Sequence, residues 1–140
     1  MLAQSELLGD VVDTDYGYDW WWPFNASLQM YDNGYYSYLP YFTLYKFVKS
    51  ANDVISVVDV TDPTITDEIR GLGSISHAFR AFSYYTLMVL FEPVENIYTD
   101  CSKVLGLTVP IVTEETTNDI AKSNPRATHE EMVNFILLTL

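Results

Sequence analysis

An uninterrupted helical pattern that begins between Pro63 and Asp67 and runs to about Phe91 dominates this sequence and leaves few folds open. Pro93 ends it. Its apolar side chains recur at helical spacing in two rows: the first is Ile69, Leu72, Ile75, Phe79, Phe82 and Val89, and the second is Ala78, Ala81, Tyr85 and Met88. A helix that is apolar on two faces requires cover on two sides. We therefore expect neighbouring helices on both sides of it, approaching closely at small residues such as Gly71 and Gly73.

Two further helices are predicted on either side of this central one. The first spans about Leu39 to Asp59, with Pro40 in its first turn, where the missing N–H is not needed. A later helix begins at Thr128, because Glu131 three residues on completes a capping box. Its apolar face consists of Met132, Phe135, Ile136 and Leu140.

The remaining sequence is predicted to be loop. We interpret residues 1–140 as a single helical domain that is a fragment of a larger protein, with an acidic, aromatic loop at 9–34 and a long loop at 92–127. Within the second loop, residues 109–112 favour a short extended segment, because the residue before proline avoids helical geometry. The predicted fold is all-α: a tetratricopeptide-like antiparallel helix array with long irregular loops.

Charge and composition exclude several classes of function. The formal net charge of −12 argues against nucleic acid and against docking on anionic lipid. One cysteine, Cys101, permits neither an internal disulfide nor a cysteine-based metal site. No apolar run is long enough for a transmembrane helix, and no signal peptide follows Met1.

Four short motifs occur in an order that resembles the SusD/RagB family of starch-utilisation-type lipoproteins. They are Tyr41, Tyr45, Val48 and Ala51-Asn52; Arg80-Ala81, Tyr84, Leu87 and Phe91; Pro110-Ile111-Val112-Thr113; and Arg126, Thr128 and Glu131. The resemblance covers roughly residues 38–140. Glu92-Pro93 replaces the glycine usual in the family, and the stretch 94–106 is longer than the usual connection.

The resemblance implies a non-catalytic function. Family members bind oligosaccharides at the outer face of the bacterial outer membrane, are anchored by an N-terminal lipid, and cover a TonB-dependent transporter. By this resemblance the chain is the N-proximal helical part of such a protein, lacking the signal and the lipid anchor, and we expect no enzyme activity and no cofactor. The alternative is a tetratricopeptide-type protein–protein interaction domain that binds no sugar.

One loop segment combines aromatic rings with polar side chains in the way that sugar binding requires. Its candidate ligand-binding residues are Tyr16, Tyr18, Asp19, Trp20, Trp21, Trp22 and Asn25. Aromatic rings stack on the C–H faces of sugars, and exposed aromatic patches usually mark binding surfaces. Packing of these rings against the helices is the more common use, and because consecutive residues face different ways, both uses can occur together.

Other reactive residue types favour structural roles. The acidic cluster at 10–19 lacks the spacing of a calcium hand and is interpreted as a solvated loop. His77 and His129 have no ligand-spaced partner, and the adjacent pairs Glu114-Glu115 and Glu130-Glu131 do not converge for glycoside hydrolysis. Arg80 is expected to form a structural salt bridge or to contact a carbonyl, and Asn52 to hydrogen-bond a neighbouring loop.

Overall fold

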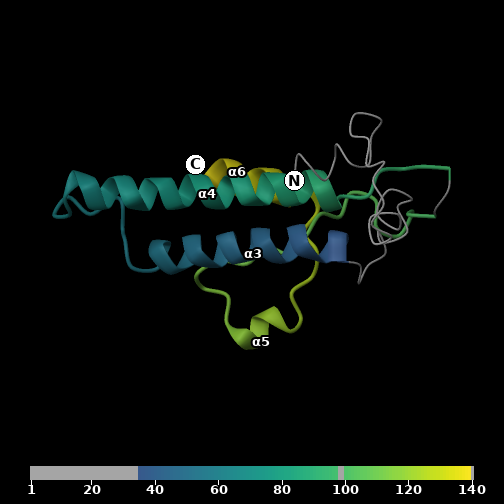
Figure 1. The fold of residues 1–140 in the computed structure, drawn as a ribbon, viewed down its shortest axis with the longest axis horizontal. Helices are drawn as coiled ribbons and strands as arrows, with labels where there is room; N and C mark the ends of the chain where they lie inside the picture. Colours follow the sequence, from purple (N-terminus) through teal and green to yellow (C-terminus); the bar gives the residue numbers. More distant parts are fainter. Residues whose placement is uncertain (1–34, 98–99, 140) are drawn as a thin grey trace, which may run out of the picture. The chain divides into compact units, whose positions relative to one another are not determined.

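The computed structural model describes residues 35–97 and 100–139, and all regular secondary structure in these ranges is helical (Figure 1). The chain divides into two compact units, Met1–Thr43 and Leu44–Leu140. The fold is all-α, as predicted, whereas the tetratricopeptide-like arrangement stays a prediction. In the described ranges, no helix is both long and apolar enough to cross a bilayer.

The first described helix, α3, spans Tyr35–Ile55 and therefore begins and ends about four residues earlier than expected. Pro40 lies inside α3 rather than in its first turn. A proline six residues into a helix lacks the N–H that would bond the carbonyl four residues before it, so the start of α3 forgoes one hydrogen bond. Beyond α3, the carboxylates of Asp59 and Asp62 accept hydrogen bonds from Thr61 and Thr64, forming two consecutive turns.

The central helix, α4, spans Asp67–Phe91, within the expected bounds. The Thr66 side chain caps its first turn by accepting a hydrogen bond from the Ile69 N–H, which the sequence reasoning had not singled out. Asp67 and Glu68 follow in the first turn, where negative charge favours the helix dipole.

Burial along α4 differs from the expectation of cover on two sides. The buried residues are Gly73, Arg80, Ala81, Ser83, Tyr84, Leu87 and Met88. By contrast, the whole first predicted row, from Ile69 to Val89, is exposed. Among the described residues, α3 and α6 both pack on the side of α4 that carries Arg80 and Tyr84, and no described helix covers the opposite face.

Close approach at Gly73 involves a loop rather than a neighbouring helix. A Cβ atom at position 73 would lie 2.5 Å from Cγ1 of Val60 and 2.9 Å from Cγ1 of Val58. A Cβ atom at Gly71, in contrast, would have no described atom of another segment within 4 Å. The turn after α3 therefore lies against the start of α4, and only one of the two glycines is required for that packing.

The last described helix, α6, spans His129–Thr139 and begins with the predicted capping box. The Thr128 N–H and hydroxyl donate to the Glu131 carboxylate, and the Glu131 N–H donates to the Thr128 hydroxyl. Met132 is fully buried, and Phe135 packs edge-on against Tyr84 of α4. Met132 and Phe135 of the predicted α6 face thus pack into the protein as expected.

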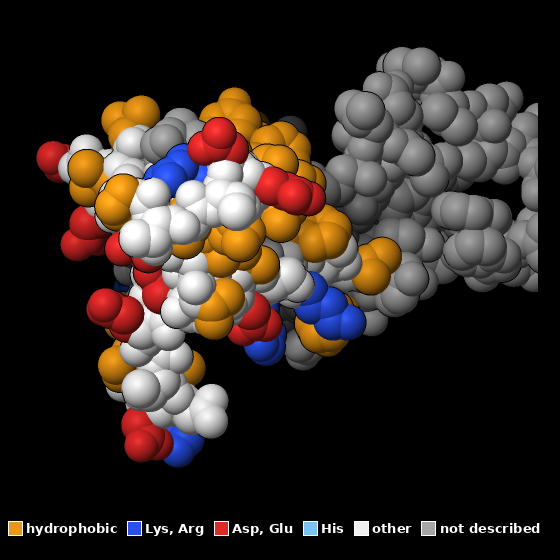
Figure 2. Space-filling model, turned by 90° about the vertical axis from the view of Figure 1, so that its left-hand side faces the viewer, with side chains coloured by type: hydrophobic (Ala, Val, Ile, Leu, Met, Phe, Trp, Pro, Cys, Tyr) orange, Lys and Arg blue, Asp and Glu red, His pale blue; other side chains and the backbone are white. Residues whose placement is uncertain are grey.

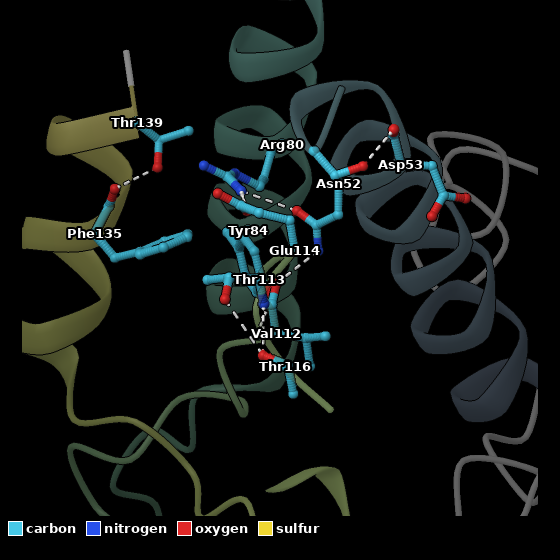
Figure 3. A network of polar contacts seen from close by, with 11 residues as sticks. Asn52, Asp53, Arg80, Tyr84, Val112, Thr113, Glu114, Thr116, Phe135 and Thr139 are labelled. Carbon is cyan, nitrogen blue, oxygen red and sulfur yellow. Dashed lines mark hydrogen bonds and ion pairs between the residues drawn. The ribbon is translucent and has the colours of Figure 1, made fainter. Parts of the chain in front are cut away.

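Contacts between the helices show that α4 is antiparallel to both of its neighbours. Asn52 of α3 contacts Arg80 of α4. Tyr45, which lies earlier on α3, contacts Tyr84, which lies later on α4. On α6, Phe135 meets Tyr84 while His129 meets Glu92. Figure 3 shows α4 between α6 and α3, with the side chains of the core between them.

The long loop at 92–127 contains one element that was not expected. A single helical turn, α5, spans Asn118–Ala121 and is capped by the Thr117 side chain. It projects away from the other helices, as Figure 1 and the lower edge of Figure 2 show. Antiparallel backbone hydrogen bonds form at the start of the expected extended segment and just before it. Thr108 N–H donates to Ala127 O (2.7 Å), and Ala127 N–H donates to Val109 O (3.2 Å).

Candidate functional site

The sequence-predicted ligand-binding residues, Tyr16, Tyr18, Asp19, Trp20, Trp21, Trp22 and Asn25, all lie outside the described residues. The acidic cluster at 10–19 lies there too. Their part in ligand binding therefore stays a prediction. The described residues instead show a polar network at the centre of the helices (Figure 3).

Arg80 is the charged centre of this network. Its guanidinium is buried, donates from Nη1 to Asn52 Oδ1 (2.9 Å), and forms an ion pair with Glu114 Oε2 (2.5 Å). The same group lies over the Phe135 ring, with Cζ 5.4 Å from the ring centroid. Nε of Arg80 is buried and has no hydrogen-bond partner within residues 35–97 and 100–139. The predicted structural salt bridge of Arg80 is confirmed. Together with the contacts to Asn52 and Phe135, it joins helices α3, α4 and α6 to the loop.

Glu114 is held in its charged form by this contact. Burial is the largest single influence on its pKa and raises it, but hydrogen bonds from its own backbone and from Arg80, with the charges of Arg80 and His77, together outweigh burial. The pKa of Glu114 is therefore lowered from its ordinary value. Glu114 is exposed as a residue, but its side chain is only 28% exposed because its carboxylate contacts Arg80.

Two further side chains hold the backbone of the same loop. The Tyr84 hydroxyl donates to Val112 O (2.9 Å) and accepts from Val112 N–H (2.7 Å), while Asn52 Nδ2 donates to Val112 O (3.0 Å). Tyr45 donates to Pro110 O (2.5 Å). The prediction that Asn52 hydrogen-bonds a neighbouring loop is confirmed. Buried polar groups are paired in this way because leaving them unpaired is costly.

Arg126 forms a second clamp, which the sequence reasoning found only as a motif position. Its Nε donates to Thr108 O (2.5 Å), and its Nη2 donates to Phe91 O (2.8 Å) and Leu107 O (3.2 Å). One guanidinium thus joins the C-terminal end of α4 to the loop that leads into α6. In the sequence, the only signal for such a role was that Arg126 follows Pro125 and lies two residues before the helix cap Thr128.

The remaining reactive residue types do not converge on a catalytic arrangement. His129 Nδ1 lies 2.9 Å from Glu92 Oε2, a partner that sequence reasoning had missed, and Cys101 Sγ lies 3.7 Å from Val94 O. Within residues 35–97 and 100–139, no group of three or more His, Cys, Asp or Glu side chains is placed to hold a metal ion. The described network therefore stabilises the fold and holds the loop in place. None of its residues is a nucleophile next to a general base.

The fold and the polar network define an all-α protein in which buried charged and polar side chains attach a long loop to the helices. Comparison with known families then identifies it. The chain belongs to a SusD-like family described as "Starch-binding associating with outer membrane", whose model matches residues 5–140. The resemblance to SusD/RagB proteins is thereby confirmed. No curated protein and no solved structure matches the chain.

Proposed function

We propose that this chain is the helical part of a non-catalytic glycan-binding protein that captures oligosaccharides at the outer face of the outer membrane. The family match over residues 5–140 is the observation that carries the proposal. In the full-length protein a lipid anchor holds it at the membrane, and a TonB-dependent transporter is its partner. Starch-type α-glucans are the substrate class to test first, because the family description names starch.

The polar network supports a scaffold role for the described helices. The polar groups of Arg80, Asn52 and Tyr84 form hydrogen bonds with other residues of the same chain. A sugar-binding surface needs aromatic rings and polar groups that face solvent. We therefore assign ligand contact to the aromatic segment 16–25, with all three tryptophans at positions 20–22.

Tryptophan fluorescence tests this assignment directly. Because the tryptophans are consecutive, any ligand-induced change in emission reports on that segment alone. Titration with maltoheptaose should change the emission, and calorimetry should give the same dissociation constant. Single alanine variants of Trp20, Trp21 and Trp22 should weaken binding for at least one position, while the exposed Tyr85→Ala variant on α4 should not.

Either of two results would count against the proposal. Absence of heat and of a fluorescence change with every α- and β-glucan tested would leave the chain without a sugar-binding role. Binding that survives all three tryptophan variants would remove the ligand contact from segment 16–25. A catalytic alternative would require release of reducing ends during long incubation, and none is expected.

A further inference from the structure

We draw no further inference here: the strongest candidate, the exposed apolar patch on the face of α4 that carries Leu72, Phe79 and Phe82, supports no proposal because nothing in the part of the chain that the structure describes shows what covers it.

Discussion

The Tyr84→Phe substitution removes one hydroxyl oxygen from the core and should measure how strongly the loop at 92–127 is attached to the helices. The Tyr84 side chain is fully buried, and its hydroxyl satisfies both the N–H and the C=O of Val112. Tyr84→Phe keeps the ring, and with it the edge-on contacts to Tyr45 and Phe135. The substitution therefore removes two hydrogen bonds and leaves the apolar packing in place.

The magnitude follows from what each atom of Val112 loses. A typical hydrogen bond contributes about 0.5–1.5 kcal/mol net, so two bonds account for about 2 kcal/mol. The carbonyl keeps its bond from Asn52 Nδ2 at 3.0 Å, but the N–H loses its only described partner. Leaving a buried donor unpaired costs about 1–3 kcal/mol. Since Val112 is only partly buried, water can reach it in part, and we expect a total loss of about 1.5–3 kcal/mol.

Urea unfolding followed by far-ultraviolet circular dichroism measures this loss. The midpoint should fall while the slope m stays constant, because the surface exposed on unfolding does not change. Tyr85→Phe is the matched control: it removes the same atom one residue later, from a side chain that is 55% exposed, and should change the unfolding free energy by less than about 0.5 kcal/mol. If Tyr84→Phe also stays below that value, the hydroxyl does not hold the loop and the reasoning fails.

Three further predictions concern a glycine, a helix cap and a carboxylate. Gly73→Ala should destabilise the chain by about 1–3 kcal/mol, because the added Cβ would meet the stiff Val60 side chain. Gly71→Ala should instead stabilise it by about 0.5–1 kcal/mol. Thermal unfolding of the two variants tests both expectations. Thr128→Ala should cost about 1 kcal/mol in urea unfolding through loss of the capping box, and no loss would argue against the cap. The lowered pKa of Glu114 means that its charge stabilises the fold above the ordinary pKa of 4.5 and that this contribution is lost as pH falls through the folded-state pKa. The stability difference between the wild type and Glu114→Gln should therefore close as pH is lowered below about 4.5, and a constant difference would refute this.

Local signals in the sequence were enough to predict the three longer helices, α3, α4 and α6. Pro93 and the acidic first turn fixed the extent of α4, and the Thr128–Glu131 spacing fixed the start of α6. These signals act within one or two turns, so no tertiary context was needed. The start of α3 was placed too late because Pro40 was assigned to the first turn; the helix tolerates it further in.

Burial and long-range pairing could not be read in the same way. Both predicted rows of α4 have helical spacing, but periodicity does not tell which side of a helix is covered. The first row is exposed throughout and Tyr85 of the second row is exposed too, whereas the buried Tyr84 and Leu87 belonged to neither row. The partner of Arg80 was likewise out of reach, because Glu114 lies 34 residues away and only the folded loop brings the two together. The short helix α5 is a single turn, which is too short for any periodic signal.

The Arg126 clamp has a consequence for how the chain opens. Because one guanidinium bonds Phe91 O, Leu107 O and Thr108 O, the last turn of α4 and the strand-like pairing of the loop cannot separate without breaking the same side-chain contacts. Segments that are linked in this way open as one cooperative unit. The backbone amides of Thr108 and Ala127, which pair across the loop, should then exchange with solvent at the same free energy as those in the last turn of α4. At these two amides the loop would exchange as slowly as the end of α4, and not as fast as a freely exposed connection.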